Sequence, residues 1–255
     1  MTRIALLEID ISDSVSIENR LLQSRELIQK SIDLNCELII FPELWLGSAH
    51  NVDLMLMSEE VLWFQFLTEV QDLCARHNIY VHCGSAAIKY EGVRNRSFFV
   101  EPNRRVSYYD KRKIFGFGFG ESLLIGGGED DCISRFKTSK IAMFTCYDLR
   151  FPELFRSSLG KGMEVAIICA DWPKSRLDHW TNLLCARAIE NQVFVIGCNG
   201  VGVQGNIEIG GGSMIFSPEG ELVVTQTACS SLLVGEINLE EVYKTRDNFP
   251  VLKDR

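Results

Sequence analysis

Short apolar runs alternate with amphipathic segments almost from one end of the chain to the other. Residues 3–9 and 37–41 are apolar enough for buried strands, and residues 16–34 between them carry apolar side chains at helical spacing. Residues 59–77 repeat the helical pattern, and residues 79–83 form another apolar run. This alternation predicts strands connected by helices, which is typical of an α/β protein.

The second half of the chain keeps the alternation and ends in a series of strands. Turn residues such as Gly84 and the Glu91-Gly92 pair indicate a hairpin region over residues 84–109. The pattern further predicts strands over residues 140–145, 164–170, 193–198, 212–217, 222–227 and 232–237, and helices over residues 152–159 and 175–191. The sequence contains no repeat and no low-complexity linker, so we expect a single domain over residues 1–255, with helices outside β layers.

Composition and charge exclude several classes of function. The chain is 46% hydrophobic and 24% charged, as is usual for a globular protein, and its net charge of −8 argues against a general nucleic-acid or anionic-membrane binder. The N-terminus is too short and too acidic for a secretory signal, and no apolar run approaches the roughly 18 residues that span a bilayer. We therefore expect a soluble, cytoplasmic protein.

One of the nine cysteines stands out by its position. The chain has no Cys-x-x-Cys pair, so neither a disulfide framework nor a metal site is indicated, and Cys83, Cys169 and Cys198 lie in apolar runs as small buried hydrophobes do. Cys146 instead ends an apolar run and is followed at once by a helix-like stretch. Negative charge is favoured beside the first N–H groups of a helix, which can lower the pKa of a thiol and make it a nucleophile.

Two further polar residues stand where apolar runs end. Glu43 follows Pro42, which forbids further ladder pairing, so the chain turns there and presents the carboxylate at the edge of the sheet. Lys111 follows the predicted strand that ends near Tyr109. Taken alone, Glu43 fits a solvated loop carboxylate, Lys111 a surface charge and Cys146 a structural thiol, since those environments are the commoner ones.

Together the three residues form a chemically complete set. A carboxylate in a pocket can take the thiol proton, because desolvation raises its pKa toward neutrality. Attack on a carbonyl creates an oxyanion, which the Lys111 ammonium and the backbone N–H of Tyr147 would stabilise. Arg150 and Arg176 suit a substrate carboxylate, although each also fits an ion pair with a nearby acid such as Glu153.

A Cys–His pair is the usual alternative, and it requires a histidine near the thiol. The chain has four histidines, at positions 50, 77, 82 and 179. Spacing alone excludes none of them, but none has a distinctive context. His179, beside Trp180 in a predicted helix, fits a role in packing or hydrogen bonding.

The motifs around these residues resemble those of the nitrilase, or carbon–nitrogen hydrolase, superfamily, from the first predicted strand to about residue 240. Phe41-Pro-Glu43 resembles the general-base motif, Tyr109-Asp-Lys111 the lysine motif and Cys146-Tyr-Asp-Leu-Arg150-Phe-Pro-Glu153 the nucleophile motif, in the family's order. The run Trp172-Pro-Lys-Ser-Arg176-Leu-Asp-His179-Trp180 is similar to that of omega-amidases, and residues 186–192 and 212–220 match as well.

This resemblance implies a four-layer α-β-β-α sandwich that dimerises through its helices, and an amidase that needs no cofactor. It implies a second glutamate, best matched by Glu121, which would hold Lys111 and the nucleophile in place. It also implies that Trp172, together with Arg150 and Arg176, contacts the substrate. The implied substrate is a small omega-amide with a free carboxylate, such as a 2-oxo-dicarboxylate monoamide.

The sequence departs from many relatives beside the predicted site, which leaves the substrate open. Lys113-Ile114 stands in place of His-Leu, and Gly126-Gly-Gly128 in place of Pro-Gly, in or next to the glycine-rich loop of residues 116–128. Whether this loop acts as a lid also stays open. The alternatives are a deaminated-glutathione amidase, an N-carbamoyl amide hydrolase, a true nitrilase, or a catalytically silent member that binds a partner.

Overall fold

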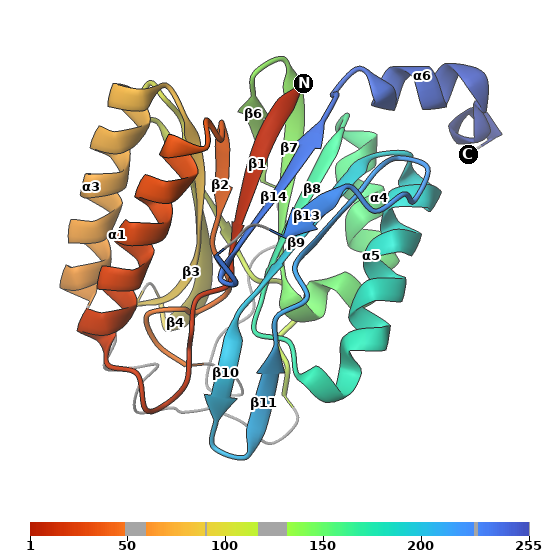
Figure 1. Cartoon of the computed structure of the whole chain (residues 1–255). Helices are drawn as coiled ribbons and strands as arrows, with labels where there is room; N and C mark the ends of the chain where they lie inside the picture. Colours follow the sequence, from red (N-terminus) through yellow and green to blue (C-terminus); the bar gives the residue numbers. More distant parts are fainter. Residues whose placement is uncertain (49–59, 90, 117–131, 227–228, 255) are drawn as a thin grey trace.

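Two β-sheets that face each other form the centre of the molecule (Figure 1). The computed structural model describes residues 1–48, 60–89, 91–116, 132–226 and 229–254. The larger sheet has the order β13 (Val224–Gln226), β14 (Leu232–Ile237), β1 (Thr2–Leu7), β2 (Leu38–Ile40), β3 (Tyr80–Lys89), β4 (Val93–Val100) and β5 (Val106–Asp110). The smaller sheet has the order β12 (Met214–Phe216), β9 (Phe194–Asn199), β8 (Val165–Ala170), β7 (Ser139–Thr145) and β6 (Ile133–Phe136).

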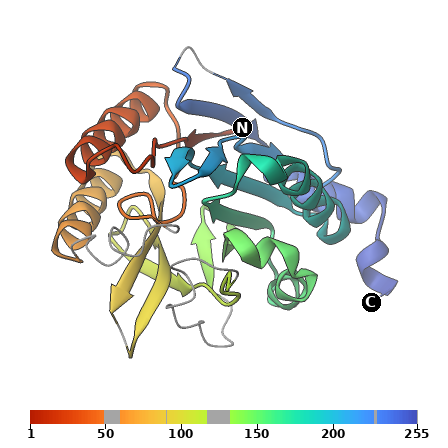
Figure 2. The same ribbon diagram turned by 90° about the horizontal axis from the view of Figure 1, so that it is seen from below.

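Each sheet contains a parallel core of three neighbouring strands. In the larger sheet β1, β2 and β3 run parallel, and in the smaller sheet β7, β8 and β9 do so. These strands read as near-continuous apolar runs because both of their faces are covered. The carboxyl ends of parallel strands share one edge, and this edge faces the viewer in Figure 2, which shows the molecule from below.

Helices cover the outer face of each sheet. Helices α1 (Ile17–Asp33) and α3 (Glu60–His77) lie against the larger sheet, and α4 (Pro152–Gly160) and α5 (Leu177–Asn191) against the smaller one (Figures 1 and 2). Three hydrophobic clusters fill the spaces between these layers. Leu6 and Ile167 lie in the cluster between the two sheets, Phe66 of α3 in the cluster on the larger sheet, and Phe155 of α4 in the cluster on the smaller sheet. The predicted α/β fold, a four-layer α-β-β-α sandwich, is confirmed.

The long helices match their sequence pattern closely. Helix α1 begins after Ser16, whose side chain accepts a hydrogen bond from the Asn19 N–H, as an N-cap residue does. Leu21 and Ile28 are buried, as the helical spacing predicted, whereas Leu22, which the same spacing places with them, is exposed.

Several elements differ from the predicted ones. The strand predicted over residues 79–83 continues to Lys89, because its register shifts between His82 and Ser85 and lets it pass through Gly84. The short strands β6, β10 (Val201–Gln204) and β11 (Ile207–Gly210) and helix α6 (Glu241–Asn248) were not predicted. Helix α6 buries only two of its side chains, so it carries almost no apolar periodicity.

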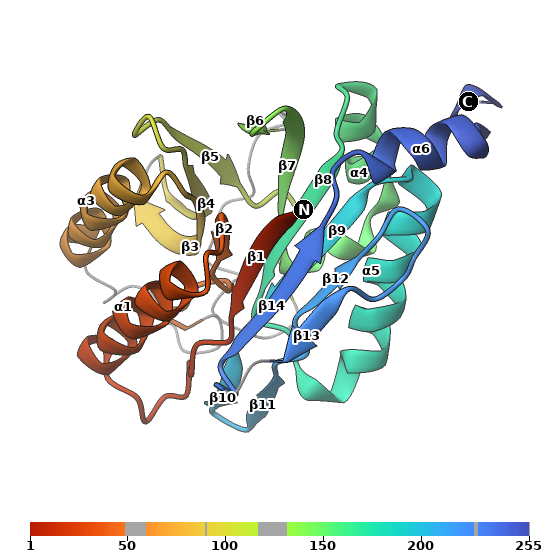
Figure 3. The same ribbon diagram turned by 45° about the horizontal axis from the view of Figure 1, so that its top comes forward.

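Helix α6 and the short 3-10 helix η4 (Val251–Asp254) lead the chain past the α4–α5 layer to the C-terminus (Figure 3). Among the residues that the structure describes, no helix has the length and apolar character needed to cross a membrane.

Candidate active site

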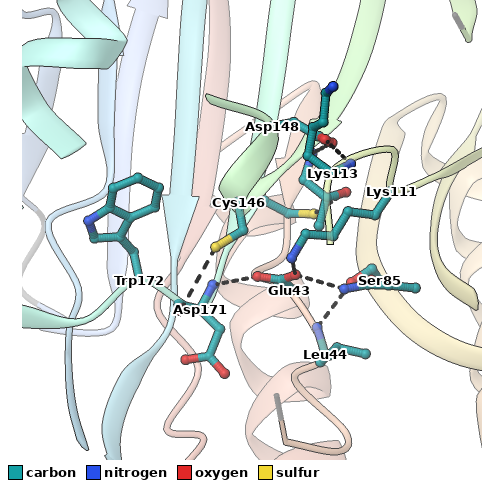
Figure 4. A network of polar contacts seen from close by, with 12 residues as sticks. Glu43, Leu44, Ser85, Lys111, Lys113, Cys146, Asp148, Asp171 and Trp172 are labelled. Carbon is teal, nitrogen blue, oxygen red and sulfur yellow. Dashed lines mark hydrogen bonds and ion pairs between the residues drawn. The ribbon is translucent and has the colours of Figure 1, made fainter. Parts of the chain in front are cut away.

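The three predicted catalytic residues all follow strands, and they come from both sheets. Glu43 follows β2 after two intervening residues, Lys111 follows β5 directly, and Cys146 follows β7 directly. Figure 4 shows their side chains pointing toward one another at the edge where the parallel strands end. The facing of the two sheets is therefore what brings the segments together.

The Glu43 carboxylate is buried and accepts three hydrogen bonds. Its Oε1 accepts from Lys111 Nζ at 2.8 Å and from Asn95 Nδ2 at 2.7 Å. Its Oε2 accepts from the backbone N–H of Asp171 at 3.0 Å. Only 1% of the residue's surface is exposed, so these donors replace water around the carboxylate.

Close backbone contacts hold the turn that carries Glu43. Gly84 has a φ of +68°, and a Cβ atom there would lie 1.9 Å from the Pro42 carbonyl oxygen, so only glycine allows β3 to approach this segment. The Leu44 N–H donates to Ser85 Oγ at 3.1 Å. From α1, the buried Arg20 guanidinium donates to the carbonyl oxygens of Trp45 and Gly47. The turn is thus fixed from two sides.

Lys111 is as deeply buried as the glutamate it contacts. Its residue is 1% exposed, and its backbone N–H donates to the Asn95 carbonyl oxygen at 2.9 Å. Asn95 on β4 therefore contacts both members of the ion pair, Lys111 through its backbone and Glu43 through its side chain. Removing either member of a buried pair leaves an uncompensated charge, which is strongly unfavourable.

Cys146 occupies a strained turn. Its φ is +46°, in the left-handed region that costs a non-glycine residue roughly 1–3 kcal/mol. Cys146 is the first residue of the five-residue 3-10 helix η2 (Cys146–Arg150), and α4 begins at Pro152. The helix-like stretch after the thiol is thus a 3-10 helix, followed by the α-helix that was predicted from residue 152. Cys146 Sγ lies 4.0 Å from the Asp171 carbonyl oxygen, and Asp171 in turn donates to Glu43. The Cys146 thiol and the Glu43 carboxylate thus both contact the backbone of Asp171, the thiol at its carbonyl oxygen and the carboxylate at its N–H.

Asp148 connects the turn of the thiol with the segment of the lysine. Its Oδ2 accepts from the Tyr109 hydroxyl at 2.8 Å and from the Thr145 N–H at 3.0 Å. Its Oδ1 accepts from the Lys113 N–H at 2.9 Å. Figure 4 shows the Asp148 carboxylate directed at this backbone beside Lys111.

Comparison with known proteins identifies the family. The model of the carbon–nitrogen hydrolase family matches residues 3–247. The chain belongs to this family. It is 30% identical to a 2-oxoglutaramate amidase of Paenarthrobacter nicotinovorans over 99% of this chain and 88% of the relative. It is 37% identical to the omega-amidase YafV of Escherichia coli over 67% of each protein.

Solved structures of carbon–nitrogen hydrolases share the fold. A crystal structure from Xanthomonas campestris, described as a superfamily protein with an arsenic adduct in its active site, superposes with a TM-score of 0.84. The two sequences are 28% identical, and the match covers 100% of this chain and 97% of the other. This carbon–nitrogen hydrolase therefore shares the fold of that relative over nearly its whole length.

The predicted substrate contacts form a second group beside the thiol. The Arg150 guanidinium lies over the Trp172 ring at 4.7 Å, and its two terminal nitrogens lie 3.4 Å from His179 Nδ1. The Trp172 indole N–H donates to the Arg176 carbonyl oxygen at 2.8 Å. Burial lowers the pKa of Arg150, and the positive charge of Arg176 lowers it further. The two guanidinium groups are therefore close enough to repel each other. Glu153 contacts Lys113 at 4.0 Å rather than Arg150 in the described contacts.

The remaining predicted residues occupy different positions. Tyr147 follows the thiol directly, and its ring packs on Phe115 and Phe151 with centroid distances of 5.2 Å each. Glu121 and residues 117–128 of the glycine-rich loop lie outside the described residues, as does His50. Within the described segments, no group of three or more His, Cys, Asp or Glu residues is arranged to hold a metal ion.

The structure also places residues at the site that sequence reasoning did not assign. Asn95 and Asp171 contact Glu43, and Asp148 contacts both segments described above. Apolar patterning does not mark these residues, because Asn95 lies between two arginines in β4, and Asp148 and Asp171 lie outside the strands. His82 is fully buried on β3, where its Nδ1 accepts from the Gly84 N–H at 3.2 Å, and burial lowers the pKa of His82 to about 3.

Proposed function

We propose that this enzyme hydrolyses the terminal amide of a small 2-oxo-dicarboxylate monoamide, such as 2-oxoglutaramate or 2-oxosuccinamate, to the acid and ammonia. The observation that carries the proposal is the alignment over 99% of the chain with a protein named 2-oxoglutaramate amidase. The contacts among Glu43, Lys111 and the Cys146 turn support it, because they supply a base, a cation and a thiol.

In the acylation half of the proposed reaction, Glu43 takes the thiol proton and Cys146 sulfur attacks the amide carbon. The oxyanion of the tetrahedral intermediate receives hydrogen bonds from the Lys111 ammonium and the Tyr147 N–H. Glu43 then gives its proton to the amide nitrogen, the carbon–nitrogen bond breaks, and ammonia leaves. The carbon–sulfur bond of a thioester remains.

In the deacylation half, water replaces ammonia beside the thioester. Glu43 takes a proton from this water while the water oxygen attacks the thioester carbon. The Lys111 ammonium and the Tyr147 N–H stabilise the second oxyanion, as they did the first. The carbon–sulfur bond breaks, the sulfur recovers the proton from Glu43, and the carboxylic acid leaves. One water is consumed and one ammonia is released, with no cofactor in the balance. Glu121 would hold Lys111 in place throughout.

The second group of residues suits the free carboxylate of the substrate. We infer that Arg150 and Arg176 bind it, since a guanidinium forms two parallel hydrogen bonds with a carboxylate. Trp172 supports this role because its ring lies against the Arg150 guanidinium and its indole holds the Arg176 backbone. A carboxylate between two cations would also relieve their mutual repulsion.

A substrate panel tests the proposed function. Ammonia release is measured with 2-oxoglutaramate, 2-oxosuccinamate, deaminated glutathione, N-carbamoyl amino acids and small nitriles at equal concentration. The proposal predicts the highest kcat/KM for one of the two short monoamides. A higher kcat/KM for the tripeptide-like amide, a carbamoyl compound or a nitrile would replace the proposed substrate with that class. Ammonia from none of them would favour a silent binding member.

Replacing Arg150 tests the carboxylate contact separately. Arg150→Met keeps an unbranched side chain but removes the guanidinium and its hydrogen bonds to a charged group, so we expect KM for the monoamide to rise roughly 10- to 100-fold. The ratio of kcat/KM for the monoamide to that for propionamide should fall by the same factor. Lys174→Met removes a positive charge from the exposed pair with Glu208 and should leave the ratio unchanged. An unchanged ratio in Arg150→Met excludes the contact.

We further propose that the enzyme works in the cytoplasm as a homodimer, without a nucleic-acid or membrane partner. Ile189 of α5, Tyr243 of α6 and Phe249, which follows α6, are large exposed hydrophobic side chains, as is Leu222 before β13. Such a group favours an interface because its burial removes apolar surface from water. Light scattering during gel filtration checks this: a mass of twice the chain's 28.9 kDa is expected, and a monomer mass at micromolar concentration contradicts the dimer.

A further inference from the structure

Asp148 is a fully buried carboxylate for which the proposed reaction has no direct use. None of its surface is exposed, and it lies two residues after the thiol, within η2. Burying a carboxylate costs free energy unless hydrogen bonds from the protein replace those of the lost water. Asp148 has three such bonds, from the Tyr109 hydroxyl and the N–H groups of Thr145 and Lys113.

The three donors belong to two segments that carry different reacting groups. Thr145 directly precedes Cys146, so its N–H ties the carboxylate to the turn of the thiol. Tyr109 and Lys113 lie two residues before and two residues after Lys111, so their bonds tie the same carboxylate to the lysine segment. One side chain thereby fixes the thiol turn and the lysine segment relative to each other.

We propose that Asp148 is a positioning residue, which in its ionised form holds the Cys146 turn against the Lys111 segment and so sets the distance between sulfur and ammonium. This inference rests on the proposed roles of Cys146 and Lys111. Asp148 itself touches no reacting atom. Its effect is on the geometry in which the two groups meet the amide, and misplacement by about 1 Å can cost a reaction roughly 100-fold in rate.

The ionised form is required because all three partners can donate. A carboxylate can accept from two N–H groups and a hydroxyl at once, whereas a carboxylic acid turns one oxygen into a donor. Protonation therefore breaks or weakens one of the bonds to the Lys111 segment or to the thiol turn.

Burial places the protonation of Asp148 in an accessible pH range. Burial raises the pKa of Asp148 to about 6, while the Thr145 N–H, the Lys111 charge and the Tyr109 hydroxyl oppose that rise. Arg112 acts on the Tyr109 phenol from the same segment. Asp148 is thus ionised above about pH 6 and becomes protonated as the pH falls through this value, which should contribute to the acid side of the kcat profile.

Tyr109→Phe provides the sharpest test, because it removes one of the three donors and keeps the ring. Without the hydroxyl the carboxylate is less stabilised, so the acid limb of the kcat–pH profile should move to higher pH by roughly half a unit to one unit. At pH 8 Asp148 stays ionised and still joins the thiol turn to the lysine segment through the Thr145 and Lys113 N–H groups, so kcat should change by less than about threefold. Tyr108→Phe removes a hydroxyl from the exposed neighbouring side chain and should leave the profile unchanged.

Asp148→Asn provides the second test, since its amide NH2 group would face a backbone N–H, which can only donate, in either orientation: that of Thr145 or that of Lys113. We expect kcat to fall roughly 10- to 100-fold with KM changed less than about threefold. The rates are expressed per folded active site, counted by titration of Cys146 with iodoacetamide. A residue that serves stability alone would lower the melting temperature but leave kcat per active site unchanged.

Two results would overturn the inference. One is an acid limb in Tyr109→Phe that coincides with that of the wild-type enzyme, because this result would show that the limb does not depend on the Tyr109 hydroxyl. The other is an unchanged kcat per active site in Asp148→Asn. Both experiments need an active wild-type enzyme, so failure of the proposed function appears earlier, in the substrate panel.

Discussion

At the scale of single residues, the site is a set of buried charges satisfied by named donors. Glu43, Lys111 and Cys146 could be predicted as a set, because each follows a predicted strand and their surroundings resemble three family motifs in the family's order. Taken alone, each fits a commoner role. Asn95 could not be predicted in the same way, because its role depends on the register of β4 against β5. Asp171 acts through its backbone, whose contacts a side-chain pattern does not reveal.

His82 carries a prediction on stability at this scale. Burial lowers its pKa to about 3, from 6.5, so the folded state binds fewer protons than the unfolded state between these values. Its stabilising contribution is present above pH 6.5 and is lost as the pH falls. Between pH 6 and 4 the wild-type unfolding free energy should fall by about 1.4 kcal/mol per pH unit more than that of His82→Asn.

Urea unfolding at several pH values measures the pH slope of the unfolding free energy for each protein. Subtracting the slope of His82→Asn from that of the wild type cancels the contributions of titrating groups that both proteins share. His77→Asn, at the exposed end of α3, is the control variant and should keep the wild-type slope. Equal slopes in His82→Asn and wild type would show that His82 does not titrate differently in the folded state.

At the scale of elements, the turn after β2 depends on the irregularity in β3. The sequence predicted that Pro42 ends the strand, and it does. It also suggested that Gly84 ends the next strand, whereas β3 bulges there and continues. In a sequence, a glycine is compatible with both a turn and a bulge. The choice at Gly84 depends on the close approach of the Pro42 carbonyl, which comes from another strand segment and is not visible in the local sequence.

Gly84→Ala should therefore damage both stability and the site. The new methyl group would meet the Pro42 carbonyl oxygen at 1.9 Å in a backbone conformation that disfavours alanine. We expect the unfolding free energy to fall by about 3 kcal/mol, and kcat to fall because Glu43 is displaced. Gly160→Ala is the matched control, since a Cβ at this end of α4 meets nothing within 4 Å. Equal stability of the two variants would contradict the role of Gly84.

At the scale of the whole molecule, the site exists because two parallel units face each other. The β1–β2–β3 unit and the β5 end contribute Glu43 and Lys111, and the β7–β8–β9 unit contributes Cys146 and Asp171. Apolar runs predicted most of these strands, but the same runs are compatible with many ways of pairing sheets. The motif resemblance, rather than periodicity, predicted the four layers. That the chain forms a single domain stays a prediction.

The central claim is that hydrolysis proceeds through the Cys146 thiol at the meeting of these two units. Ammonia release from 2-oxoglutaramate by Cys146→Ala tests it most directly, with Cys185→Ala, a partly exposed cysteine of α5, as the matched control. The account predicts that Cys146→Ala loses about 10⁴-fold or more in kcat, because the substitution removes the sulfur that forms the thioester, while Cys185→Ala retains the wild-type rate. Comparable ammonia release by the two variants would contradict the account.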